Sequence, residues 1–122
     1  MLVLIAIMMI GFMVTIAFSV DVAQMHLSRT ELRTATDAAS KAAAAKLAET
    51  MDQKLAIRRG QEIAEANRVN GDPLLLSEAD FVFGRSVEQQ SGKFEFTANA
   101  KPQNTVQVNG RRTAGSLSGP VP

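Results

Sequence analysis

The sequence predicts an α+β protein in which a long N-terminal α-helix is followed by a small three-stranded antiparallel β-meander. Residues 1–20 hold 17 apolar side chains and no charge, whereas residues 21–122 hold all 13 basic and 12 acidic side chains. No Gly or Pro interrupts residues 12–59, which favours an unbroken helix. Residues 79–113 change to the alternating apolar and polar pattern of β-strands.

The apolar run at residues 1–20 is long enough to cross a membrane as a helix, which takes about 20 residues. Three interpretations stay open: a cleaved secretory signal, a plain single-pass anchor, and a helix that is later buried among identical helices. Ala17-Phe18-Ser19 has the small-x-small form of a cleavage site, but the run is longer than the apolar core of most signal peptides. Because the sequence starts abruptly in apolar residues, we expect a processed N-terminus.

The helix is predicted to run as one element from about residue 2 to residue 69, with residues 21–70 as its polar, Ala-rich continuation. Eight of the fourteen residues from Ala35 to Ala48 are Ala, the strongest helix former. The first clear stop signals are Asn70-Gly71 and the following Asp-Pro pair. Gly60 is the expected weak point, because a glycine inside a helix costs about 1 kcal/mol.

Small side chains along this helix favour close packing against other helices, although an Ala-rich solvated spacer is the alternative. Because no second helix is predicted, copies of the chain are the expected partners. The predicted subunit-packing residues are Leu2, Leu4, Ile5, Ile7, Met9, Phe12, Ile16, Val20, Ala35, Ala39 and Ala42.

Asp21 is the charge at the boundary of the apolar run. An unpaired carboxylate is expensive to bury, so a partly buried Asp21 would pair with a cation of a neighbouring subunit. Arg29 and Arg33 are the candidates for this pairing between subunits, together with the α-amino group. The alternative is an ordinary flanking residue in the lipid headgroup layer.

Residues 71–113 are predicted to form a small antiparallel β domain, with an extended tail at residues 114–122. The pattern predicts strands at residues 79–85, 93–98 and 105–109. The predicted sheet core consists of Phe81, Phe83, Phe94, Phe96, Val106 and Val108, with the Phe residues of the first two strands facing each other. Such a sheet needs a helix on one face, which we expect to be the C-terminal half of the long helix.

The sequence offers no pattern of catalytic or metal-ligating residues. It has no cysteine, a single histidine at His26, and glycines that form neither a dinucleotide-binding nor a phosphate-binding fingerprint. A net charge of +1 without a basic patch among aromatic residues does not favour nucleic acid. We therefore expect no enzyme activity, no cofactor, no small-molecule substrate and no nucleic-acid partner.

The segment FSVDVAQMHLSRTELRTATDAASKAAAAKLAE resembles the start of TadE/TadG-like proteins of the Tad (Flp, tight-adherence) pilus system. Those proteins have an apolar segment that ends in a VDV-type motif, followed by a Leu- and Arg-containing turn and a DAA-plus-alanine run. The matching positions are Val20, Asp21, Val22, Leu27, Arg29, Leu32, Asp37, Ala38, Ala39 and residues 42–45. The later FVFGRS, residues 105–108 and RRTAGSLSGPVP also look like the region that follows the helix in this family.

The resemblance implies a type IV pilin-like subunit that is inserted in the bacterial inner membrane and then built into a surface filament, with roles in adhesion or pilus assembly. The implied partners are copies of the chain, the pilus-assembly machinery and, before assembly, the membrane. The alternative is a bitopic membrane protein that acts as a non-polymerising assembly scaffold or adaptor. One departure is Ile5, which stands where type IV pilins usually carry a glutamate.

Overall fold

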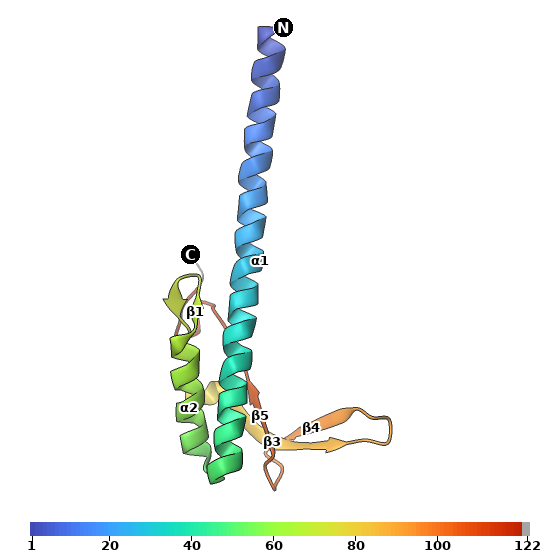
Figure 1. Ribbon diagram of the computed structural model, residues 1–122, viewed down its shortest axis with the longest axis vertical. Coiled ribbons are helices and arrows are strands. Elements are labelled where there is room, and N and C mark those ends of the chain that lie inside the picture. Colours follow the sequence, from blue (N-terminus) through green and yellow to red (C-terminus); the bar gives the residue numbers. More distant parts are fainter. Residues whose placement is uncertain (121–122) are drawn as a thin grey trace.

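The protein is a long helical stalk with a small head packed around the C-terminal half of the stalk, as the computed structural model describes it for residues 1–120 (Figure 1). The elements are α1 (Leu2–Thr50), α2 (Gln53–Ala66), β1 (Arg68–Val69), β2 (Asp72–Pro73), a 3-10 helix (Glu78–Asp80), β3 (Phe81–Glu88), β4 (Phe94–Ala98) and β5 (Thr105–Val108). The predicted α+β class is confirmed, with a long N-terminal helix followed by an antiparallel three-stranded sheet.

The predicted single helix over residues 2–69 is wrong, because the chain turns back between α1 and α2 (Figure 1). Met51 adopts the left-handed backbone conformation, with φ of 55°, which ends α1. Asp52 then caps α2, since its carboxylate accepts hydrogen bonds from the amides of Lys54 at 2.8 Å and Leu55 at 3.3 Å. Asp52 is therefore a helix-start signal, but strong helix formers on both sides of it make one continuous helix the simpler prediction from the sequence.

Small side chains spaced four residues apart form the contact between α1 and α2. Four-residue spacing places them on one face of each helix, and their size lets the two backbones approach closely. The buried positions are Ala35, Ala39, Ala43 and Leu47 on α1, and Ala56, Gly60 and Ala64 on α2. Ala35 and Ala39 are thus covered by the head of their own chain, which corrects their predicted role between subunits, and Ala42 is half-buried beside them.

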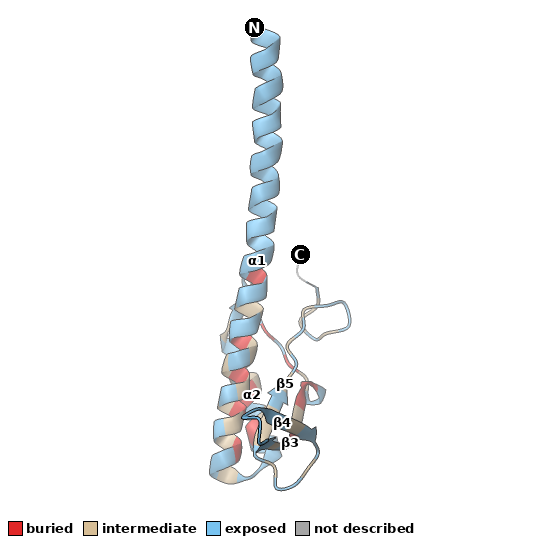
Figure 2. Cartoon of the chain, turned by 90° about the vertical axis from the view of Figure 1, so that its right-hand side faces the viewer, coloured by how far each residue is buried: buried red, intermediate tan, exposed pale blue. Residues whose placement is uncertain are grey.

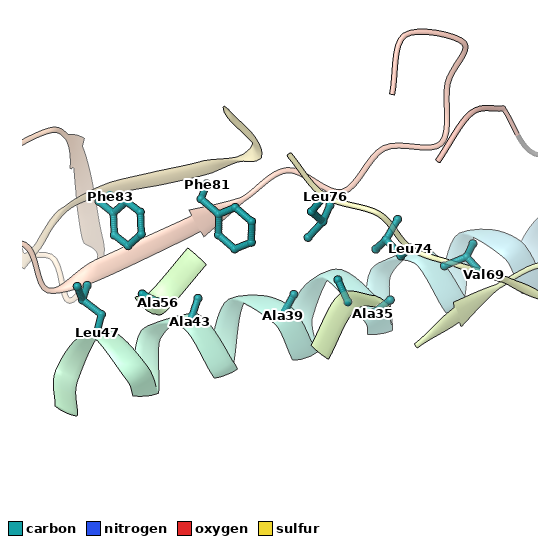
Figure 3. Close-up of a cluster of buried hydrophobic side chains, with 11 residues drawn as sticks. Ala35, Ala39, Ala43, Leu47, Ala56, Val69, Leu74, Leu76, Phe81 and Phe83 are labelled. Carbon is teal, nitrogen blue, oxygen red and sulfur yellow. The ribbon is translucent and has the colours of Figure 1, made fainter. Parts of the chain in front are cut away.

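Phe81 closes the core over both helices, and Gly60 provides the room for its ring. A Cβ at Gly60 would lie 2.5 Å from Cε1 of Phe81 and 3.2 Å from Cβ of Ala43. Gly60 therefore lies inside α2 without interrupting it, at the point where the sheet meets the helices. Figure 3 shows the rest of the core around this contact, with Phe83, Leu74, Leu76 and Val69 over the alanines of α1.

The sheet has the order β4-β3-β5, so β5 pairs with β3 and not with β4 as a meander requires. Phe81 lies opposite Val108 and Phe83 opposite Val106 in this antiparallel register. The two Phe side chains are buried against the helices, and the two Val side chains pack against the same core while half-buried.

Phe94 and Phe96 lie outside the core, which corrects their predicted pairing with the Phe residues of β3. Phe94 is opposite Glu88 and Phe96 is opposite Ser86, so both belong to the even-numbered face of β3, away from the helices. Phe94 is 71% exposed. The ring of Phe96 covers Gly84, where an added Cβ would lie 2.7 Å from the ring. The hairpin of β3 and β4 extends away from the stalk as an arm (Figure 1).

The chain after β5 returns toward the N-terminal end of the head. It turns at residues 113–116 and again at 116–119, through backbone hydrogen bonds of 3.0 and 3.1 Å. The Ser118 hydroxyl accepts from the amide of Leu75 at 2.6 Å and donates to its carbonyl at 3.2 Å. The predicted extended tail is therefore turned and docked over residues 114–120, and its residues 121–122 lie outside the described range.

Replacing Gly60 with Val is expected to lower the free energy of unfolding of the head by about 1–3 kcal/mol, because the added methyl groups overlap the Phe81 ring. The measurement is thermal unfolding of the full chain in detergent, followed by circular dichroism. Ala66→Val in the same helix is the control, since Ala66 is exposed. Equal losses of unfolding free energy in the two variants would contradict the close contact between Gly60 and the Phe81 ring.

Candidate functional site

The N-terminal half of α1 is a bare apolar helix. Residues 1–27 are all exposed, and Ser28 is the first buried residue (Figure 2). Near the N-terminus, α1 is long and apolar enough to cross a membrane, and none of that window is buried in the chain. At 1.5 Å per residue, residues 1–27 extend about 40 Å. This segment needs a cover of lipid or protein.

Apolar side chains surround the whole circumference of this segment, as is typical of a membrane span or of a helix buried on every side. All the predicted subunit-packing residues up to Val20 are exposed here. The apolar segment also contains the small residues Gly11, Thr15 and Ser19, which are four residues apart and thus lie on one face of the helix. The Thr15 hydroxyl donates to the carbonyl of Gly11 at 2.8 Å, so it leaves no unsatisfied donor in an apolar surrounding.

A groove begins where the apolar segment ends, with α1 as one wall and residues 108–112 as the other. It consists of two adjoining hollows of about 670 and 600 Å³, which share Arg29 and Leu32. The hollow nearer the N-terminus, termed the upper hollow, is lined by Asp21, Gln24, Met25, Ser28, Arg29, Leu32 and Arg112. The lower hollow is lined by Arg29, Leu32, Arg33, Thr36, Asp37, Ala79, Asp80, Val108, Asn109, Gly110 and Arg111.

The three charged residues predicted to pair between subunits all line this groove. Asp21 lies in the upper hollow, Arg33 in the lower, and Arg29 in both. Within the described residues 1–120, none of the three forms an ion pair. Their charges are thus open to a partner outside the chain, and pairing between subunits stays a prediction.

Asp80 holds the second wall of the groove in place. Its carboxylate accepts from the amide and the hydroxyl of Ser77, both at 2.8 Å, and from the guanidinium of Arg111 at 3.1 Å. Its backbone carbonyl accepts from the amide of Asn109 at 2.9 Å. Burial of the Asp80 carboxyl raises its pKa, but the hydrogen bonds from Ser77 and the charge of Arg111 outweigh burial and lower the pKa below its ordinary value.

Arg112 fastens the returning chain to the hairpin of β1 and β2. Its side chain is only 4% exposed, and one guanidinium nitrogen donates to the carbonyl of Val69 at 2.9 Å. The other lies 3.5 Å from the carboxylate of Asp72. The buried Nε has no hydrogen-bond partner among the described residues.

Sequence reasoning missed both Asp80 and Arg112. The Ser77-x-x-Asp80 spacing of a capping box was the available signal for the first, and it is present in the structure. Nothing local distinguishes Arg112, whose contacts with Asp72 and Val69 are 40 and 43 residues away in the chain. Among residues 1–120 no group of three or more His, Cys, Asp or Glu is placed to hold a metal ion.

Replacing Asp80 with Asn is expected to cost about 2 kcal/mol of unfolding free energy at neutral pH, because hydrogen bonds to a charged group are lost. A lowered native pKa means that this stability is present above the unfolded pKa and disappears as the pH falls through the native one. The difference between wild type and Asp80→Asn in thermal unfolding should therefore shrink below about pH 4. Glu78→Gln, at an exposed position, serves as control. If the stability difference between wild type and Asp80→Asn stays unchanged down to pH 3, the stabilising role of the charged Asp80 carboxylate is refuted.

Residues 1–46 match the sequence model of one protein family, described as "Putative Flp pilus-assembly TadE/G-like". The matched region contains the apolar segment, the charged boundary at Asp21 and most of the Ala-rich part of α1. No curated protein and no solved structure matches the chain. The resemblance to TadE/TadG-like proteins is thus confirmed for the N-terminal region, and that of the later segments stays a prediction.

Proposed function

We propose that this TadE/G-like chain is a pilin-like structural subunit of a Tad pilus system. It enters the bacterial inner membrane through residues 1–20 and then joins an envelope filament by packing this segment against those of other copies. The observation that carries the proposal is the bare apolar half of α1, which is exposed on every side. The family match over the same residues supports a role in pilus assembly.

The apolar segment cannot remain in water. Burying one large apolar side chain is worth about 1.5–3 kcal/mol, and residues 1–20 expose fifteen of them. Lipid and packed neighbouring helices are similarly apolar, so moving from one to the other costs little hydrophobic free energy. The segment is therefore suited both to a membrane stage and to a filament stage.

The small residues Gly11, Thr15 and Ser19 support packing between helices over lipid alone. Lipid gives no preference to small side chains, whereas helix pairs in membranes use them to bring backbones together. The head restricts such packing to the N-terminal part of α1, because α2 and the sheet already cover the face that includes Ala35 and Ala39. In the proposed filament, the apolar segments form the core and the heads lie outside it.

The alternative is a bitopic scaffold or adaptor that stays in the membrane and does not polymerise. The arm formed by β3 and β4 favours this alternative, because the arm extends away from the stalk (Figure 1) and leaves Phe94 exposed, where a partner protein could bind it. The two functions require the same membrane insertion and differ in whether copies assemble through residues 1–20.

Gly11→Leu tests the packing of copies. We expect this variant to enter the membrane normally but to lower the number of filaments in material sheared from cells, as seen by negative-stain microscopy with an antibody to the head. Ala6→Leu adds the same kind of bulk on the opposite face of the helix and is the matched control. Recovery of the wild type solely as small detergent-extracted particles would instead favour the scaffold, and equal effects of the two variants would exclude the glycine face as the contact.

A further inference from the structure

We infer that the groove beside α1 binds the phosphate group of an acidic phospholipid, with Arg29 as the principal contact. This inference rests on the part of the proposed function that inserts residues 1–20 in a membrane. It assigns to the groove a ligand that would fix how deeply the chain sits in the bilayer.

The groove opens at the depth of the lipid headgroups. If residues 1–20 cross the hydrocarbon layer of about 30 Å, the headgroup layer occupies the next 5–7 Å or so. Asp21 and Gln24, which line the upper hollow, fall in this layer. Arg29 begins about 13 Å beyond Val20, but helix side chains lean toward the N-terminus, and a long arginine can extend its charge back toward the interface.

Arg29 is a cation of the groove that has no acidic residue three or four positions away on α1. It lines both hollows and has no ion pair within residues 1–120. Arg33 follows one turn later and lines the lower hollow, where Asp37 at the i,i+4 position can offset its charge. Asp21 lies two turns from Arg29, too far along the helix for such a pairing. A phosphate would supply the missing negative charge.

The opposite wall adds a second cation. Arg112 contributes to the upper hollow with a buried guanidinium whose Nε lacks a partner among the described residues and whose one carboxylate contact, to Asp72, is long at 3.5 Å. The acidic residue that lines the upper hollow is Asp21, whereas Asp80 lines the lower hollow and is already engaged by Ser77 and Arg111. The lining of the upper hollow thus places the guanidinium groups of Arg29 and Arg112 against the single carboxylate of Asp21, and this excess of positive charge favours an anion.

The remaining lining fits an amphipathic ligand. Gln24 and Ser28 offer polar groups, while Met25 and Leu32 offer apolar surface beside them. The volume of about 670 Å³ lies within the range of small-molecule sites. Acyl chains attached to the bound phosphate would lie along the exposed apolar side chains above Asp21, which a free phosphate ion would leave uncovered.

The test measures lipid binding to the full chain in neutral detergent by native mass spectrometry. Phosphatidylglycerol is expected to bind in preference to phosphatidylcholine with the same acyl chains, and Arg29→Gln should weaken that binding about fivefold, the effect of one cation near an anionic membrane surface. Arg58→Gln makes the same charge change on an exposed position of α2 and should have no effect. Arg29→Lys, which keeps the charge, should retain most of the binding.

Equal binding of the two lipids, or equal weakening by Arg29→Gln and Arg58→Gln, would overturn the inference. Loss of phosphatidylglycerol in millimolar inorganic phosphate would assign the groove to a free anion and would also overturn it. Flotation with vesicles of phosphatidylcholine alone separates this test from that of the proposed function. A chain that fails to float lacks membrane insertion and counts against both, whereas one that floats without lipid preference counts against the lipid site alone.

Discussion

The close approach of α1 and α2 is the contact on which the rest of the head depends. Ala and Gly at every fourth position leave a shallow surface between the helices, and only such a surface admits the ring of Phe81 beside Gly60. Phe81 belongs to β3, so its contact with the helices positions this strand, and both β4 and β5 are paired to β3. The core is therefore small in side-chain volume but continuous from the helices to the central strand.

This contact also divides α1 into two halves with different surroundings. From Ala35 to Leu47 one face is covered by the head, whereas residues 1–27 are all exposed within the described part of the chain (Figure 2). The groove with Arg29 lies at the border between the halves, and Asp80 and Arg112 hold its second wall. In the proposed arrangement, membrane lipid and later neighbouring copies surround residues 1–20, and lipid headgroups contact the groove that follows.

Much of this plan could be predicted from the sequence, because it depends on patterns that are local. The apolar run, the α+β class and the N-terminal family resemblance each rest on contiguous residues. The turn at Met51 could not be predicted in the same way, since strong helix formers surround the capping Asp52. The alternation of Phe residues predicts strands but not the register between β3 and β4, so the sequence wrongly predicts Phe94 in the core. Arg112 became recognisable only through contacts distant in the chain.

The uninterrupted course of α1 from the apolar segment into the head has a mechanical consequence. No hinge separates the two parts, as the helix runs without a break from Leu2 to Thr50. Membrane helices tilt by about 20° on average, and residues 21–50 extend about 45 Å beyond the apolar run. A tilt of that size would swing the far end of the head sideways by about 15 Å. The stalk is therefore a lever, and the angle at which its N-terminal part is seated decides where the arm of β3 and β4 points.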